Sequence, residues 1–482
     1  MADSADFLAS SFSSMSLAAS APAAAQPPFS VALIHGPEMQ AHAPPQLTDV
    51  YELPCRIVAI ECQLRGEDVE TYVTQRTGNL KGGAAPPVRY HPAAKDLHTI
   101  DQAGGALGGE WVGSPPKGEV GDIDRFQHAP INILLGDGRD SAEGEVAFPD
   151  DDNEWVALDV GNNGGLWAEC RALRAPRAMP QWVSLVHTEE HIREQVRRVL
   201  VARSLSNALQ QGDMFYGPLS LTAALHAVGG AVEAVRCLFP PMRAPDTPVA
   251  SFAIVRPPGH HCDGTTASGF CLFSNTATAA AYARRELGLS RVAIVDTDYH
   301  PGDGSQNIFY DDPSVLTISV HAAIRARHPG DIDKANIAPE PFVCWPYSHA
   351  KAASFRGRGA AEGMNINIPW PHEYVDDHDY EEAMRTIIVP ALRAFQPEVI
   401  LWACGFDAAE GDKLAGLKLS TRGYFRIARH LAGAVPGVPL ATILEGGYDP
   451  KKIALSAENV VRGLLGRAFP RGHLNVRFYV YV

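Results

Sequence analysis

The segment from Arg291 to Gln306, RVAIVDTDYHPGDGSQ, constrains the fold of this chain more than any other stretch. Its first residues, RVAIV, are apolar and rich in β-branched side chains, so they predict a buried strand. Asp296, Asp298 and His300 follow at every second position, and on an extended chain this spacing sends all three side chains to one side. Because an open α/β sheet binds ligands at the carboxyl ends of its strands, we expect a metal-competent site at this edge.

Pro301 ends the predicted strand, and a turn follows it. Gly302 and Gly304 flank Asp303 in this turn. Glycine lets the backbone bend closely around a bound group, which favours a binding role for the turn.

Adjacent histidines, His260 and His261, follow a second predicted strand, Val249–Val255. The preceding Pro-Pro-Gly turn is rigid and presents both rings. Such a pair alone is more often a surface or core feature than a catalytic one. Asp296 and Asp303 change that balance, because a carboxylate bonded to the far ring nitrogen fixes the tautomer and tunes the imidazole pKa. The sequence therefore predicts two His–Asp pairs.

Two more predicted strands lead into polar residues. Glu398–Ala403 leads to Asp407, where a third metal ligand would be needed. Val438–Leu444 leads to the sequence EGGY, in which two glycines let the phenol of Tyr448 point back over the strand ends.

Apolar residues make up 46% of the 482 residues, which is enough for a large core. We expect an α/β fold, a single large domain with a central parallel sheet flanked by helices. Other predicted elements are strands at Ser30–Ile34 and Pro313–Val320, helices at Arg56–Leu64, Leu219–Phe239, Thr276–Leu287 and Asp379–Phe395, and a helix that starts near His187 with Thr188 as its cap.

Composition divides the chain into regions. Residues 1–28 are rich in Ala, Ser and Pro and contain no Lys or Arg, so they predict a disordered tail rather than a secretory or transit signal. Residues 29–467 are expected to form the main domain, with a Gly-, Pro- and acid-rich insertion at about 78–177. Residues 468–482 are unassigned.

Charge and cysteine usage limit the function classes. The formal net charge of −14 argues against nucleic-acid binding and suits a cationic substrate. Eight cysteines without a CxxC pair fit a reducing compartment, so we expect a cytoplasmic or nuclear protein. No apolar run is long enough to cross a bilayer.

Together these motifs resemble the zinc-dependent histone deacetylase family, in particular its class II-like branch and the bacterial acetylpolyamine amidohydrolases. The resemblance covers about Pro28 to Leu465, interrupted by the insertion. The matching motifs stand in family order and read PEM, ELPCRIVAI, VHTEEHI, RPPGHH, GFCLFSN, DTDYHPGDGSQ, ISVH, GAAEGMNINIP, CGFDAAEGDKLAG and LEGGY.

The resemblance implies an arginase/deacetylase-like three-layer α/β/α fold, one catalytic Zn²⁺ and a monovalent cation. It assigns the zinc to Asp298, His300 and Asp407, the catalytic roles to His260, His261, Asp296, Asp303 and Tyr448, and substrate contacts to Gly269, Phe270, Leu414 and Gly446. The K⁺ would lie near Asp296, His300 and Ser319. A second aromatic of the substrate tunnel falls on His328, Trp345 or Tyr347, and the sequence leaves these three open.

Three functions follow as hypotheses. The first is deacetylation of lysine side chains in histones or other proteins, and the second is deacetylation of acetylpolyamines or other small acetylated amines. The third is a catalytically silent scaffold, which loss of a ligand or replacement of Tyr448 by His would favour; neither has occurred. An arginase-like dimanganese site would need further Asp and His ligands that the strand ends do not carry. Protein partners could bind through the insertion.

Overall fold

The computed structural model describes residues 31–36, 39, 55–65, 166, 169–204, 209–211, 213–217, 219–241, 248–324, 345–346 and 352–467. At its centre lies an eight-stranded sheet in the order β2-β1-β5-β10-β9-β6-β7-β8, in which all neighbouring strands run parallel. The strands are β1 Val31–His35, β2 Arg171–Arg174, β5 Ala250–Ala253, β6 Val292–Asp296, β7 Val315–Ala322, β8 Asn365–Trp370, β9 Val399–Cys404 and β10 Leu440–Leu444. A separate antiparallel hairpin joins β3 Leu209–Gln211 to β4 Met214–Tyr216.

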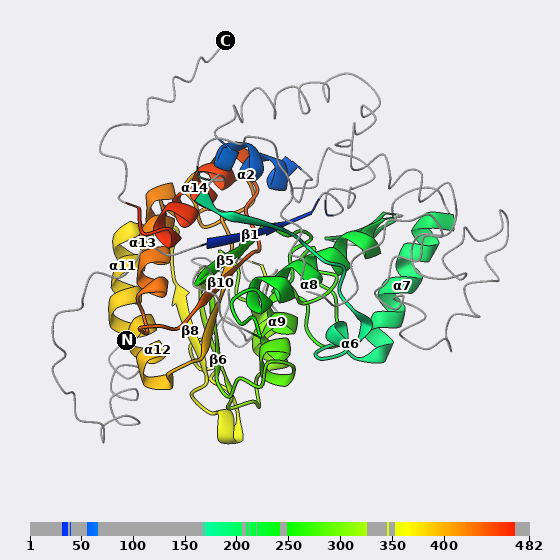
Figure 1. Ribbon diagram of the computed structural model, residues 1–482, viewed down its shortest axis with the longest axis horizontal. Helices are drawn as coiled ribbons and strands as arrows, with labels where there is room; N and C mark the ends of the chain where they lie inside the picture. The colour runs from blue at the N-terminus through cyan, green and yellow to red at the C-terminus, as the bar shows by residue number, and fades with distance from the viewer. Residues whose placement is uncertain are drawn as a thin grey trace, which may run out of the picture.

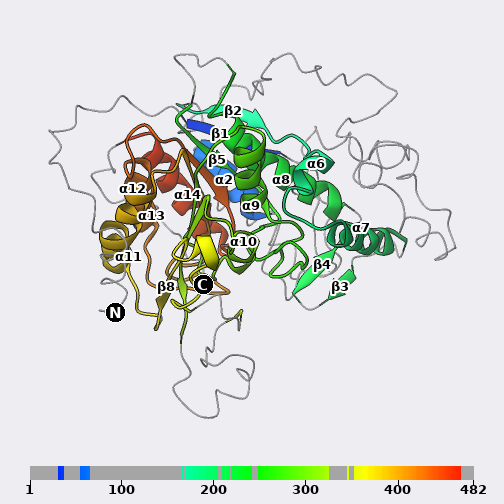
Figure 2. The same cartoon turned by 90° about the horizontal axis from the view of Figure 1, so that it is seen from below.

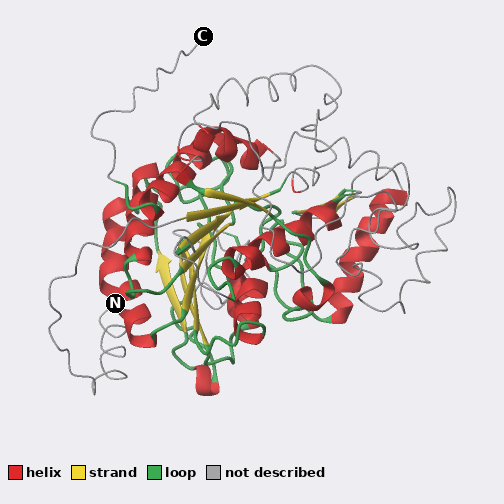
Figure 3. Ribbon diagram, viewed as in Figure 1, coloured by secondary structure: helices red, strands yellow, loops and turns green. Residues whose placement is uncertain are grey.

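Helices cover both faces of the sheet, which gives the three-layer arrangement seen in Figures 1 and 3. Helices α8 and α9 lie on one side, and α11, α12 and α13 lie on the other, as the second view also shows (Figure 2). The helices are α2 Cys55–Arg65, α6 Pro180–Val183, α7 Glu189–Ser204, α8 Ser220–Arg236, α9 Asn275–Arg285, α10 Asp303–Ile308, α11 Asp377–Ala383, α12 Val389–Phe395, α13 Thr421–Ala432 and α14 Pro450–Leu464. The expected α/β fold class is confirmed.

Burial explains why the central strands are continuous apolar runs. Every residue of β5, β6, β9 and β10 is buried. A parallel strand covered on both faces has no solvent side, so it does not alternate between apolar and polar residues. Glycine lets helix α8 approach the segment that follows β2: a Cβ at Gly229 would lie 1.9 Å from the Pro176 carbonyl oxygen, so only glycine fits there.

Two sequence-based boundaries need correction. The insertion was expected to run to about residue 177, but Arg171–Arg174 forms β2 and pairs with β1, so the chain has rejoined the sheet before that point. The earlier part of that range and both terminal tails lie outside the described residues. The single helix expected at Asp379–Phe395 is instead two helices joined by a π-helical turn at Met384–Ile388. Within the described residues, no helix has the length and apolarity needed to span a membrane.

Candidate active site

Four neighbouring strands, β5, β10, β9 and β6, end at one edge of the sheet. Because the strands are parallel, their carboxyl ends coincide, and residues far apart in sequence meet there. His260 and His261 follow β5, Tyr448 follows β10, Asp407 follows β9, and Asp298 and His300 follow β6.

The three predicted metal ligands, Asp298, His300 and Asp407, form a buried group whose ligand atoms all lie within 4.8 Å of one another. His300 Nδ1 is 3.2 Å from Asp298 Oδ1 and 3.2 Å from Asp407 Oδ2. Backbone donors fix the remaining carboxylate oxygens: Gly446 N–H donates to Asp298 Oδ2 at 2.8 Å, and Tyr299 N–H donates to Asp407 Oδ1 at 2.8 Å. Backbone N–H groups around the site therefore orient the carboxylates of Asp298 and Asp407.

The donor set fits a zinc ion. Asp407 Oδ2 is buried, and its one close polar contact among the described residues is His300 Nδ1 at 3.2 Å, without hydrogen-bond geometry; a buried carboxylate oxygen satisfied so poorly is costly. Burial, together with repulsion from Asp298, raises the pKa of Asp407 to about 7. Burial lowers the pKa of His300, but the two facing carboxylates outweigh it and raise this pKa to about 9. Such a negative group stabilises a cation, and Asp and His are ligands that Zn²⁺ accepts.

Asp296 does not join this group, although the alternating spacing predicted that it would point the same way. Strand β6 ends at Asp296, and the chain then bends through Asp298 and His300. The carboxylate of Asp296 instead accepts from His260 Nδ1 at 2.9 Å. The strict alternation therefore holds only as far as the strand does.

The structure brings together both expected His–Asp pairs. His261 Nδ1 lies 2.7 Å from Asp303 Oδ1, and the rings of His260 and His261 are 3.9 Å apart. Burial raises the pKa of Asp303 to about 7. Asp303 begins helix α10 rather than lying in a simple turn. Gly302, which was expected to make room for a bound group, makes room for the carboxylate of Asp296 instead. A Cβ at Gly302 would lie 2.2 Å from Asp296 Oδ2.

Glu445, which the sequence interpretation did not assign, supports the tandem histidines. Its buried Oε2 accepts the N–H of Gly259 at 2.7 Å and that of His260 at 3.1 Å, while Oε1 accepts from Thr276 Oγ1 at 2.8 Å. Burial raises the pKa of Glu445 to about 7. Its position directly before the EGGY glycines was the only sequence signal, and nothing there linked it to the RPPGHH turn.

One wall of the site is formed by Gly269, Phe270 and Trp345. Phe270 has a positive φ of 65°, which is rare for an aromatic residue and turns the chain sharply. The Trp345 ring meets the His261 ring edge to face at 4.5 Å. A Cβ at Gly269 would lie 2.4 Å from the His261 ring and 2.6 Å from Trp345, so this position is closed to larger residues. Of the three candidates for the second aromatic, Trp345 is at the site, whereas His328 and Tyr347 lie outside the described residues.

Asp213 was also missed by the sequence interpretation. Its exposed carboxylate accepts the Gly269 N–H at 2.9 Å and so holds the wall from the hairpin β3–β4. The residue lies in a short polar stretch, QGDM, that has no motif of its own.

Tyr448 is buried beside the wall. Its ring lies 6.0 Å from the Phe270 ring, and the guanidinium of the buried Arg56 lies over it at 5.3 Å. Asp412 fixes the backbone by accepting the Tyr448 N–H at 2.6 Å and the Leu414 N–H at 3.0 Å. The backbone at Tyr448 and the loop that carries Leu414 are therefore held by the same carboxylate.

The remaining predicted contacts differ in exposure. Leu414 is 39% exposed. Gly446 is buried against the metal group, since a Cβ there would lie 2.5 Å from both Asp298 Oδ2 and Asp407 Oδ2. Ser319, expected near a monovalent cation, pairs in register with Asp296, and its Oγ is 2.8 Å from His321 Nδ1.

Comparison with known proteins identifies the histone deacetylase domain in residues 155–464, well over half of the chain. Human histone deacetylase 9 is 34% identical over 63% of this chain and 30% of its own length. Human polyamine deacetylase HDAC10 is 33% identical over 69% of this chain and 46% of its own length. The chain thus spans less than half of these curated relatives. The crystal structure of the HDA15 HD domain superposes with a TM-score of 0.61 at 25% identity, covering 91% of this chain and 89% of that one.

Proposed function

Because this chain belongs to the histone deacetylase family, we propose that it removes acetyl groups from lysine side chains of histones or other proteins as a zinc-dependent amidohydrolase. The alternative is deacetylation of acetylpolyamines or other small acetylated amines. A non-catalytic scaffold ranks third, since all the predicted ligands and both His–Asp pairs are in place.

One observation carries the proposal. His261 is bonded to Asp303 at 2.7 Å, and its ring lies next to both the wall residue Trp345, at 4.5 Å, and the metal ligand His300, at 5.6 Å. A base held by a carboxylate next to a metal group is suited to metal-assisted amide hydrolysis.

Asp298, His300 and Asp407 would hold the zinc. When bound, Zn²⁺ polarises the amide carbonyl and lowers the pKa of a water molecule. Three protein ligands leave a position for water and substrate, as in catalytic rather than structural zinc sites.

His261 serves as the general base and later as the general acid. Its Nδ1 is held by Asp303, so Nε2 accepts the proton of the attacking water and then delivers a proton to the leaving amine. His260 lies deeper, bonded to Asp296 and 3.7 Å from the Asp298 carboxylate through Nε2, and provides electrostatic support. Acetate and a free amine are the products.

Tyr448 donates its phenol proton as a hydrogen bond to the oxyanion that develops on the carbonyl. Burial, followed by the Asp407 and Asp298 carboxylates, raises its pKa well above the usual value, so the phenol stays protonated. A donor of this kind typically contributes about 3–4 kcal/mol to the transition state.

The loop that Asp412 anchors is the observation that supports an acyl-lysine peptide as the substrate. Leu414 presents an apolar side chain there, and the neighbouring Lys413 faces Asp449 at 3.8 Å. Both carboxylate oxygens of Asp412 accept hydrogen bonds from backbone N–H groups. For the polyamine alternative, the exposed Asp213 next to Gly269 is the observation that would suit a distant ammonium group.

A rate comparison tests the proposal. The zinc-loaded protein is given an acetyl-lysine peptide and an N-acetylated polyamine under identical conditions, with Asp407→Ala as the blank. Preference for the peptide supports the first function and preference for the polyamine the second. Activity on neither would leave only the scaffold.

Three further points stay predictions. A K⁺ ion would bind near Asp296, His300 and Ser319, where β6 and β7 pair. A nuclear or cytoplasmic location fits the cysteine usage. Binding of protein partners through the insertion concerns residues outside those described.

A further inference from the structure

A cavity of about 550 Å³ lies near the C-terminal ends of α6, α9 and α10. Figure 2 shows these three helices near one another. None of the metal ligands, catalytic residues or wall residues described above lines this cavity. Its volume is within the range of about 300–1,000 Å³ that is typical of sites for small organic molecules. The cavity is therefore a candidate binding site that is distinct from the active site.

Two walls of the cavity belong to the segments that carry the His261–Asp303 pair. Residues 263–265 line it and begin two positions after His261. Helix α10 begins at Asp303, and its last two residues, Asn307 and Ile308, line the cavity as well. A ligand bound here would therefore contact both of the segments that place the general base and its carboxylate partner.

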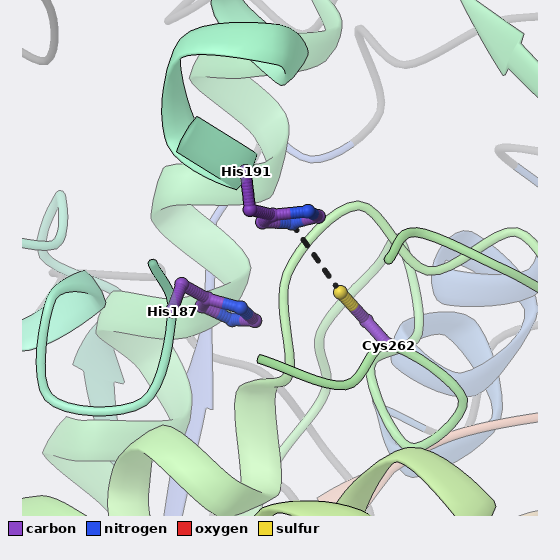
Figure 4. A group of neighbouring side chains, drawn as sticks. All are labelled: His187, His191 and Cys262. Atoms are coloured by element: carbon purple, nitrogen blue, oxygen red, sulfur yellow. Dashed lines mark hydrogen bonds between the residues drawn. The ribbon is translucent and has the colours of Figure 1, made fainter. Parts of the chain in front are cut away.

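The loop formed by residues 263–265 is fixed by contacts with the chain around the start of α7. The carbonyl oxygen of Gly264 accepts the N–H of Thr188 at 2.8 Å. Cys262, directly before the loop, lies beside the ring of His191 (Figure 4), with its Sγ 3.5 Å from Nε2. These contacts hold the loop in place, so this wall of the cavity is preformed.

Four charged side chains line the cavity, and two of them compensate each other through a hydroxyl group. Arg284 Nε donates to Ser314 Oγ at 2.7 Å, and Ser314 Oγ donates to Asp312 Oδ1 at 2.5 Å. The cation and the anion are therefore linked by one serine.

The other two charged side chains, Asp263 and Arg285, differ in their surroundings. Asp263 Oδ1 accepts the N–H groups of Thr265 and Thr266, both at 2.7 Å. The guanidinium of Arg285 is exposed and has no hydrogen bond or ion pair with any residue that the structure describes, and the same holds for the side-chain amide of Asn307. A guanidinium of this kind can bind a carboxylate or a phosphate group through two parallel hydrogen bonds.

We propose that this cavity binds a small organic anion. Its carboxylate or phosphate group would be held by Arg285 and Asn307, and its apolar body would pack against the side chains of Val186, Ile308 and Phe309, which also line the cavity. Such a ligand bridges the loop 263–265 and α10. It would therefore hold His261 and Asp303 in the paired geometry and act as a regulator of the active site.

Calorimetric titration of the full-length protein tests the site. The probes are phenyl phosphate and 3-phenylpropionate, which share an aromatic ring and differ in the anionic group, and the tighter of the two identifies the preferred anion. Arg285→Gln should weaken binding by about tenfold or more, the equivalent of one hydrogen bond to a charged group. Arg385→Gln, which removes the charge of an exposed arginine outside the cavity, is the matched control and should leave the affinity unchanged.

A second substitution tests the sign of the ligand charge. Asp312→Asn keeps an oxygen acceptor for Ser314 but removes a negative charge from the cavity, so both probes should bind more tightly. Weaker binding in Asp312→Asn would mean that a cationic ligand is preferred and would overturn the proposal. Neutral benzyl alcohol should not bind. An equivalent bound at the catalytic zinc is recognised because it disappears in Asp407→Ala and persists in Arg285→Gln.

The effect on the active site has its own readout. A saturating concentration of the tighter probe should raise kcat/KM for the acetyl-lysine peptide in the unmodified protein and leave it unchanged in Arg285→Gln. This rate measurement rests on the proposed function, whereas the calorimetry does not, so the two can fail separately. Binding without any Arg285-dependent change in rate would overturn the regulatory role. Absence of Arg285-dependent binding of both probes would overturn the site itself.

Discussion

The backbone N–H of Gly446 donates to Asp298 Oδ2 at 2.8 Å, so the chain that leaves β10 orients a carboxylate that follows β6. These strands are not neighbours, since β9 lies between them. The metal group is therefore held by contacts that cross two strand spacings.

Substitution of Gly446 by Ala should weaken zinc binding. The added Cβ would lie 2.5 Å from Asp298 Oδ2 and Asp407 Oδ2, so both carboxylates must move. Displaced ligands of this kind cost about 10- to 100-fold in metal affinity. Competition with a chelator measures the zinc affinity of the variant. Gly433→Ala is the control, because a Cβ at Gly433 would meet only the Arg429 carbonyl oxygen, at 3.3 Å. Unchanged affinity in Gly446→Ala would refute the packing argument.

His261→Ala should lower kcat/KM by about 10²- to 10⁴-fold, the usual contribution of a general base. Because His261 is not one of the three ligands, zinc content at Asp407 should not change. Rates and metal content are measured on the same preparations. Full activity of His261→Ala on both the peptide and the polyamine would disprove the role proposed for this residue.

Glu445→Gln should alter the pH dependence of stability. Burial raises the pKa of Glu445 from 4.5 to about 7. A carboxyl with a higher pKa in the folded state stabilises fully below pH 4.5, and this contribution disappears as the pH rises through about 7. Glutamine can keep an oxygen for Gly259 and His260 and an amide for Thr276, but it does not ionise.

The measurement for Glu445 is the free energy of unfolding in denaturant across that pH interval. Relative to Glu445→Gln, the unmodified protein should lose stability as the pH rises. Parallel curves for the two proteins would show that the carboxyl does not titrate in this range. Glu445→Ala, which removes all three acceptor contacts, should be the least stable at every pH.

Trp345→Ala should remove part of the wall that Trp345 forms with Gly269 and Phe270. The ring now packs 4.5 Å from His261 and 5.6 Å from His300, so its loss opens space next to the reacting carbonyl. We expect a higher KM for acetyl-lysine and relatively faster cleavage of longer acyl groups. A series of acyl-lysine peptides tests this, with Trp370→Ala as the control, since that ring packs on Tyr380. An unchanged acyl profile would argue against a tunnel role for Trp345.

Asp213→Ala should raise KM with little change in kcat, because it removes the acceptor that holds the Gly269 N–H. Loss of one hydrogen bond of about 1 kcal/mol corresponds to about a fivefold change. Asp213→Asn keeps an oxygen acceptor and should restore most of the affinity for the peptide. If the polyamine is the true substrate, Asp213→Asn should not restore the KM, since the negative charge of Asp213 would be needed to bind the ammonium group.

Periodicity and motif order predicted the central strands and all three residues of the metal group, because buried parallel strands are continuous apolar runs followed by polar residues. Peripheral elements escaped detection for the opposite reason. Strand β2, RALR, is half exposed and polar, and β8 contains a proline at the sheet edge. Neither carries the pattern of a buried strand.

The site residues that the sequence interpretation missed share another property. Glu445, Asp412 and Asp213 all bind backbone N–H groups of segments distant in sequence. Such contacts depend on how the chain returns on itself, and no spacing rule encodes them. Asp296 shows the opposite kind of error. The alternation of side chains along a strand was applied to residues beyond Asp296, where strand β6 has already ended.

The strand order has a consequence for synthesis. Strands β5 and β6 are synthesised before β9 and β10, which separate them in the sheet and are the last strands to be made. The complete site, which includes Tyr448, cannot form until the chain beyond Tyr448 has emerged. A nascent or truncated chain would therefore expose the apolar edges of its unfinished sheet, and a chaperone that shields them would matter most in that interval.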